Sequence, residues 1–181
     1  MSEFKHPSES HISISELMLP SHSNFSGKIH GGYILMLMDR VAFACAAKYS
    51  GNYAVTASVD KVDFLHPVEV GELLTLKASV NYVGRSSMVI GLRVEAENIT
   101  TGEKKHCNSS YFTMVARNES GQSVKVPGLI IDNENTMRRF VRSAIRQQQG
   151  KVRRAQFKEE HFKAEEHFEM LEKYNVKIEN F

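Results

Sequence analysis

The chain has 181 residues, of which 41% are hydrophobic and 24% are charged. This length and composition fit one soluble globular domain with an appendage better than two domains. A net charge of +2 gives no overall signal for nucleic-acid binding. The two cysteines, Cys45 and Cys107, each lie in an apolar stretch, which predicts free buried thiols and points to a reducing cytosol.

The N-terminal residues are polar and lack the apolar segment of a secretory signal. The longest apolar stretch, residues 33–47, is interrupted by Asp39 and Arg40. It is also shorter than the roughly 20 residues that a membrane-spanning helix needs. We therefore expect a cytoplasmic protein without a membrane span.

Residues 10–19 alternate between apolar and polar side chains and predict a strand, with a bulge near Glu16 where the alternation changes parity. Pro20 should end that strand, and residues 21–28 have a loop composition. A helix is then expected over residues 32–49, ended by Ser50-Gly51-Asn52. Because this helix is apolar nearly all round, something must enclose it.

Four strand-like segments follow, over residues 54–64, 74–82, 88–96 and 107–116, with turn residues between them. Their short links predict an antiparallel meander. One sheet that wraps one apolar helix would satisfy the burial needs of both elements. The fold class expected is α+β.

The last 50 residues have a different character, because they are rich in helix-forming residues and segregate their charge. Residues 133–158 are strongly basic, and residues 159–174 are rich in glutamate. The basic half could attract an anionic substrate or nucleic acid, or it could be the solvated face of an oligomerising helix. Without interleaved aromatic residues for base stacking, nucleic acid is not favoured as a partner.

Asp39 is the first candidate for chemistry. Its helical neighbours three and four residues away are all apolar, and Arg40 lies about 100° around the helix, so neither supplies an ion pair. Burying an unpaired carboxylate is costly unless tertiary partners donate hydrogen bonds. The alternatives are a functional carboxylate and a half-buried helix whose Asp39 faces water.

Three further groups of residues carry weaker signals. His30-Gly31-Gly32 stands where a loop becomes a helix, so its backbone amides could polarise a carbonyl oxygen. The alternative is an ordinary glycine-rich turn in which His30 makes a structural hydrogen bond. Asn24 lies in the preceding loop and could hold a water or carbonyl, or simply form a turn.

Arg85, Ser86 and Ser87 form a turn between two strands that could contact phosphate or be a plain hairpin with a solvated arginine. The sequence contains no Gly-x-Ser-x-Gly, Cys-x-x-Cys or His-Glu-x-x-His motif. A serine hydrolase or a metal site therefore has no positive support.

Together these features resemble the hotdog-fold acyl-CoA thioesterases, in the branch of YciA and brain acyl-CoA hydrolase. The resemblance runs from about Ile14 to Gly128 and depends on the order and spacing of several short motifs. These are Asn24-Phe-Ser-Gly-Lys-Ile-His-Gly-Gly32, Leu37-Met-Asp39, Val55-Thr-Ala57, Asp63-Phe64, Pro67-Val68, Val70-Gly71, Gly84-Arg-Ser-Ser-Met88 and Val126-Pro127.

The resemblance implies a domain over residues 11–128, after a tail of residues 1–10 and before a charged helical extension of residues 129–181. It implies that Asp39 activates water or attacks the thioester, and that Asn24 of the partner subunit orients the water or carbonyl. The amides of His30, Gly31 and Gly32 would polarise the carbonyl, and Arg85, Ser86 and Ser87 would contact CoA.

The same resemblance implies a homodimer, assembled further into a trimer of dimers, with acyl-CoA as substrate and no cofactor other than the CoA of that substrate. Two other hypotheses stay open on the sequence. One is a non-catalytic acyl-CoA sensor that regulates transcription, and the other is a hotdog dehydratase that acts on 3-hydroxyacyl thioesters through His30 and Asp39.

Overall fold

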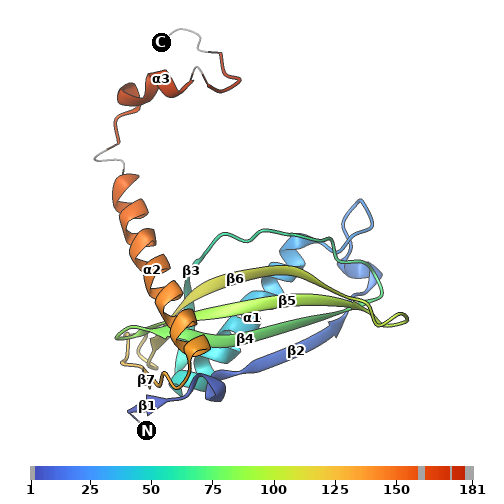
Figure 1. The fold of residues 1–181 in the computed structure, drawn as a ribbon, viewed down its shortest axis with the longest axis horizontal. Coiled ribbons are helices and arrows are strands. Elements are labelled where there is room, and N and C mark those ends of the chain that lie inside the picture. Colours follow the sequence, from blue (N-terminus) through green and yellow to red (C-terminus); the bar gives the residue numbers. More distant parts are fainter. Residues whose placement is uncertain (1–2, 159–161, 172, 178–181) are drawn as a thin grey trace. The chain divides into compact units, whose positions relative to one another are not determined.

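The computed structural model describes residues 3–158, 162–171 and 173–177. The chain forms two compact units, residues 1–143 and 144–181. The first unit is a curled antiparallel sheet with one long helix against its concave face (Figure 1). This is the α+β arrangement that the sequence predicts.

Five strands make up the main sheet, in the order β2-β4-β5-β6-β3. Their bounds are β2 Ile12–Leu17, β3 Tyr53–Val59, β4 Glu72–Val83, β5 Ser87–Asn98 and β6 Lys104–Arg117. All four pairings are antiparallel, as expected. However, the prediction of a four-strand meander is wrong for β3, which pairs with β6 at the far edge instead of with β4.

The link between β3 and β4 explains this difference. Residues 60–71 are too long for a hairpin, and they lead from β3 at one edge of the sheet to β4, which lies beside the strand at the other edge. The predicted strand over residues 54–64 also ends early, at Val59. Beyond it the chain stays near β6, where Asp60 N donates to Tyr111 O at 2.9 Å and Leu65 N donates to Cys107 O at 2.9 Å.

Helix α1, Gly31–Ser50, is the central helix predicted from the sequence. It ends at Gly51, whose φ of 67° is the left-handed conformation that a side chain disfavours. Its buried face packs on the sheet and includes Ile34, Leu37, Met38, Val41, Ala42, Cys45, Ala46 and Tyr49. The inward side chains of β4, β5 and β6 complete the core.

The predicted bulge near Glu16 is wrong, because β2 pairs with β4 in unbroken register from Ile12 to Leu17. The register shifts instead between Thr56 and Ser58 in β3 and between Val80 and Tyr82 in β4. A third shift lies between Val94 and Glu95, where β5 faces β6. A bulge bends its strand and re-aims the side chains beside it.

Short elements close the ends of this unit. Strand β1, Phe4–Lys5, pairs in parallel with β7, Gly128–Leu129. The phenol of Tyr49, at the end of α1, donates to Gly128 O at 2.6 Å and joins the helix to this pair. Two 3-10 turns flank β2, η1 at Pro7–Ser10 and η2 at Pro20–His22.

The predicted helical extension is present, and its long helix is confined to the basic half. Helix α2 spans Glu134–Gln156, followed by the 3-10 turn η3 at Ala164–His167 and helix α3 at Phe168–Leu171. Residues 159–161 and residue 172 of the acidic half lie outside the described residues. Like charges at helical spacing disfavour a long helix, which is consistent with the short elements found among these glutamates.

The start of α2 belongs to the first unit, where it lies on the convex face of the sheet. Its Phe140 ring lies 5.1 Å from the ring of Tyr82 on β4. Among the described residues, no helix has both the length and the apolar character needed to cross a membrane.

Candidate functional site

The face of α1 that points away from the sheet carries Asp39. In the single chain this face is not enclosed, which corrects the expectation of a fully wrapped helix. Met36 and Phe43, one turn before and after Asp39, are 38% and 37% exposed. Tyr53 of β3 is 63% exposed, and its ring lies 5.4 Å from that of Phe43. The carboxylate therefore lies within an exposed apolar patch.

Thr56 holds the Asp39 carboxylate. Its hydroxyl Oγ1 donates a hydrogen bond to Asp39 Oδ1 at 2.5 Å, and it also lies 3.4 Å from the sulfur of Met114 on β6. Thr56 lies on β3, directly beside the register shift between Thr56 and Ser58. Among the described residues β3 is an edge strand, which pairs with β6 alone. Thr56 lies within the Val55-Thr-Ala57 motif, but its contact with Asp39 was not predicted from the sequence.

His30 caps the start of α1. Its ring Nδ1 accepts the backbone N–H of Gly32 at 2.9 Å, and its carbonyl accepts from Tyr33 N at 2.9 Å. His30 is thus the structural hydrogen-bonder that the sequence allowed. Because His30 occupies the Gly32 amide, Gly31 is the member of this trio whose amide is best able to reach a substrate.

Gly31 also has a packing role. A Cβ atom on Gly31 would lie 3.3 Å from the ring of Phe64, so the ring rests close against the start of the helix. Phe64 belongs to the crossing segment of residues 60–71 and is 48% exposed. The Phe64 ring therefore covers part of the N-terminus of α1 and is itself partly exposed to solvent.

Tyr33 fixes this helix start to β2. Its hydroxyl donates to the carboxylate of Glu16, and this hydrogen bond is the main reason that the pKa of Tyr33 is raised. Its ring stacks on His22 with centroids 3.9 Å apart. The backbone N–H of His30 donates to His22 O at 2.8 Å. The amides at the helix start are thereby held in place.

Asn24 lies at the base of a tight loop that precedes His30. Its side-chain Oδ1 accepts from Ser26 N at 2.9 Å, Ser26 Oγ at 2.7 Å and Lys28 N at 3.2 Å. Among the described residues its amide Nδ2 donates to no protein group, so this donor is available to a ligand. Phe25, at the loop tip, is fully exposed.

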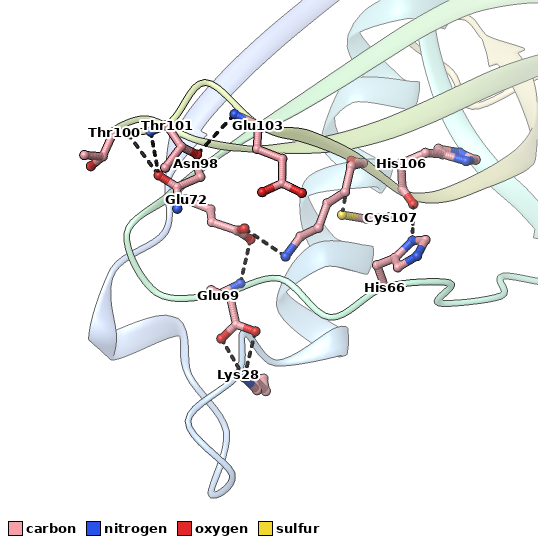
Figure 2. Close-up of polar contacts among 11 residues, drawn as sticks. Lys28, His66, Glu69, Glu72, Asn98, Thr100, Thr101, Glu103, His106 and Cys107 are labelled. Atoms are coloured by element: carbon pink, nitrogen blue, oxygen red, sulfur yellow. Dashed lines mark hydrogen bonds and ion pairs between the residues drawn. The ribbon is translucent and has the colours of Figure 1, made fainter.

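A ladder of charged side chains anchors this loop, as Figure 2 shows. Lys28 Nζ contacts both carboxylate oxygens of Glu69 at 2.7 Å. Glu69 N donates to Glu72 Oε2 at 2.8 Å, and Glu72 Oε1 in turn accepts from Lys105 Nζ at 2.8 Å. The end of the Asn24 loop is thus tied through β4 to β6.

The turn of Arg85, Ser86 and Ser87 joins β4 to β5 at the end of the sheet nearest to Thr56. Ser87 on β5 pairs with Val115 on β6, and Val115 pairs in turn with Val55 on β3. The distance between Ser87 and Val55, the residue before Thr56, is therefore two strand spacings. That is about 10 Å. Arg85 is exposed, and no ion pair of its guanidinium occurs in the described part of the chain.

One chain does not bring all of these residues together. Gly31 and Asp39 are eight residues apart on α1, which is about 12 Å along the helix axis. They cannot act on the same carbonyl group in one subunit. No cluster of three His, Cys, Asp or Glu side chains suited to a metal ion is found among the described residues.

Comparison with known proteins identifies the family of this chain. The thioesterase superfamily model matches residues 26–103. Protein VdlD of Helicobacter pylori is 44% identical over 127 residues, which cover 70% of this chain and 72% of that protein. The uncharacterized acyl-CoA thioester hydrolase YkhA of Bacillus subtilis is 32% identical over 126 residues, which cover 70% of this chain and 73% of that protein. The human cytosolic acyl coenzyme A thioester hydrolase is 32% identical over 149 residues, covering 81% of this chain and 39% of that protein.

Solved structures give the same result. A hexameric acyl-CoA thioesterase is 34% identical with a TM-score of 0.80, covering 86% of this chain and 99% of that one. An acyl-CoA hydrolase of Staphylococcus aureus in complex with butyryl coenzyme A and coenzyme A is 28% identical with a TM-score of 0.78, covering 93% and 99%. Variants of that hydrolase with an aspartate, an asparagine or a threonine changed to alanine also match. The chain therefore belongs to the thioesterase superfamily of hotdog fold, among the acyl-CoA thioester hydrolases.

Proposed function

We propose that the protein hydrolyses acyl-CoA to a free carboxylic acid and CoA, at a site that two subunits share. Asp39 and Thr56 come from one subunit, and Asn24 and the start of α1 come from the other. The observation that carries the proposal is the Asp39 carboxylate, held by Thr56 on an exposed apolar face of the central helix.

Residue spacing supports these assignments. In the Staphylococcus aureus hydrolase, the asparagine and aspartate that were altered are 15 residues apart, and the altered threonine follows the aspartate by 17. Asn24, Asp39 and Thr56 have the same two separations. The three residues changed to alanine in that relative are thus of the same types, at the same spacing, as the three polar side chains proposed for this site.

The shared site follows from geometry. Among the described residues β3 has a sheet neighbour on one side only, and the unpaired backbone groups of such an edge can pair with a strand of another chain. Pairing of β3 with its copy in a second subunit would bury Met36, Phe43 and Tyr53. It would also bring the helix start of the partner toward Asp39, which removes the separation of about 12 Å within one chain. Hexamers built from such dimers are the assembly we propose for this chain, and one structural relative is a hexamer.

The chemistry then divides between the subunits. Asp39 accepts a proton from a water molecule that attacks the thioester carbonyl carbon, or attacks that carbon itself to give an anhydride that water then cleaves. The amide of Gly31 and Nδ2 of Asn24 donate to the developing oxyanion. The C–S bond breaks, the CoA sulfur leaves and takes a proton, and the acid is released.

Arg85, Ser86 and Ser87 are the proposed contacts of the CoA phosphates. Arg85 carries an exposed guanidinium, and guanidinium groups bind phosphate through paired hydrogen bonds. The turn lies near Thr56, a separation that the long pantetheine arm of CoA can bridge.

We also propose a cytoplasmic location. The human relative is cytosolic by name. Both cysteines are free and buried, and burial raises the pKa of the Cys45 thiol to about 12, so this thiol resists ionisation and oxidation.

The purified protein tests the function directly. Release of free thiol from acetyl-, butyryl-, octanoyl- and palmitoyl-CoA, followed with a thiol reagent, should show turnover with at least one chain length. Hydration of crotonyl-CoA without thiol release would favour the dehydratase instead. Tight, salt-sensitive binding to specific DNA without turnover would favour the sensor.

Replacement of Thr56 by valine should lower kcat about tenfold, because the hydrogen bond that orients Asp39 is lost while the shape is kept. Serine at the same position retains a hydroxyl and should restore most of the activity. Steady-state kinetics of both variants check this. Equal loss in the valine and serine variants would contradict an orienting role for the hydroxyl.

A further inference from the structure

A second site lies on the convex face of the sheet, opposite the face that packs against α1. Here strands β2, β4, β5 and β6 and the first turns of α2 surround a hollow of about 590 Å³. This volume falls within the range of small-molecule sites, about 300–1,000 Å³. The residues proposed for thioester hydrolysis do not line it.

The lining of this groove is strongly cationic. Five of its side chains are Lys77, Arg93, Arg138, Arg139 and Arg142, and no Asp or Glu is among the described residues that line it. Nearby, Glu95 contacts Lys77 at 2.6 Å and Arg93 at 2.8 Å. Hydrogen bonds from these two cations lower the pKa of Glu95 to about 2, so Glu95 carries a negative charge at neutral pH. This single carboxylate offsets only part of the positive charge of the five lysine and arginine side chains.

The three arginines of α2 are crowded on one face of the helix. Arg138 and Arg142 are four residues apart, and Arg139 and Arg142 are three apart, spacings that place like charges side by side. Arg138 donates to Asn135 Oδ1 at 2.9 Å, and Arg139 donates to Ser79 Oγ at 3.5 Å. Both acceptors are neutral, so a bound anion would relieve the repulsion.

The floor of the groove adds neutral donors. Ser79 and Asn81 are only 8% and 7% exposed, and Ser79 Oγ donates to Asn81 Oδ1 at 3.0 Å. This leaves Asn81 Nδ2 as a donor that no described protein group accepts. Gly91 of β5 makes room for it, because a Cβ atom there would lie 2.1 Å from Nδ2. The missing side chain of Gly91 thus lets Asn81 lie close against β5 in the floor of the groove.

We propose that this groove binds a small phosphate ester that carries a diphosphate or triphosphate group. Planar guanidinium groups match phosphate oxygens in pairs. The number of cations suits a ligand with several negative charges, and the volume exceeds what a single phosphate ion fills. The diphosphate could belong to a free nucleotide or to CoA itself. The inference is independent of the proposed hydrolysis, because it uses none of the residues of that site.

Calorimetric titration with ADP, inorganic pyrophosphate and CoA tests the proposal. The wild type should bind ADP and pyrophosphate. The double variant R138Q/R142Q should weaken both affinities about tenfold or more. The variant K104Q/K125Q removes the same charge at positions outside the groove lining and should change the affinities by less than about twofold. Both pairs are exposed, and melting temperatures check that the variants fold.

Further titrations distinguish a free nucleotide from CoA as the ligand of the groove. R85Q changes the turn proposed to contact CoA during hydrolysis, and it should leave ADP affinity unchanged. If ADP and pyrophosphate still compete with CoA in R85Q, CoA also occupies the groove as a second site; if they do not compete with CoA in R85Q, the ligand is a free phosphate ester. The proposal is overturned if ADP does not bind, if both charge-matched pairs weaken it equally, or if R85Q alone abolishes it.

Discussion

Asp39→Asn should lower kcat by about 10²–10⁴, with little change in the melting temperature. Asparagine keeps the size of the side chain and can still accept the Thr56 hydrogen bond, but it cannot take a proton from water or act as a carboxylate nucleophile. The residue is exposed in the single chain, so the change does not disturb the core. Thiol release under saturating acyl-CoA measures the loss.

Arg40→Gln is the matched control for Asp39→Asn. Arg40 is the next residue on α1 and is also exposed, but it points about 100° away around the helix. Its kcat should stay within about twofold of wild type, since exposed charges contribute little at a distance. Normal kcat in Asp39→Asn, with normal oligomer size, would refute the catalytic assignment of Asp39.

Asn24→Ala should lower kcat by about 10²–10³, the loss typical of one oxyanion donor. The side chain also organises its own loop, since Oδ1 accepts three hydrogen bonds from Ser26 and Lys28. Asn24→Asp separates these roles, because it keeps the loop acceptors and removes the Nδ2 donor. Steady-state kinetics of both variants provide the measurement.

If the donor matters, Asn24→Asp should lose as much kcat as Asn24→Ala. If Asn24 serves only the loop, the aspartate variant should keep wild-type kcat while the alanine variant does not. Ser26→Ala is a useful control, since it removes one hydrogen bond to Oδ1 and leaves Nδ2 in place. Its kcat should fall by less than about threefold.

Local sequence signals predicted the elements that carry the site. The bounds of α1 follow from His30-Gly31-Gly32 before it and Gly51 after it, both of which are short-range features. Strict alternation placed β4 and β5 within a few residues of their observed ends. Such patterns depend only on neighbours in the chain.

Long-range features were not predictable in this way. Alternation identifies a strand but does not specify its partner, so the pairing of β3 with β6 and the bond from Thr56 to Asp39 were missed. The sequence also left open whether Asp39 lies on an enclosed or a half-buried helix, and the structure shows that one chain covers only one face of this helix. The apolar residues on the other face, Met36 and Phe43, become understandable when a second subunit is added. The groove under α2 likewise combines residues far apart in sequence.

The most direct test of a shared site is subunit complementation. Asp39→Asn and Asn24→Ala chains with different tags are co-expressed, and the mixed oligomers are isolated by both tags. In a mixed dimer one site carries both substitutions and the other carries neither, so about half of the wild-type kcat per dimer should return. If mixed dimers are as inactive as either parent, Asp39 and Asn24 do not meet across two subunits.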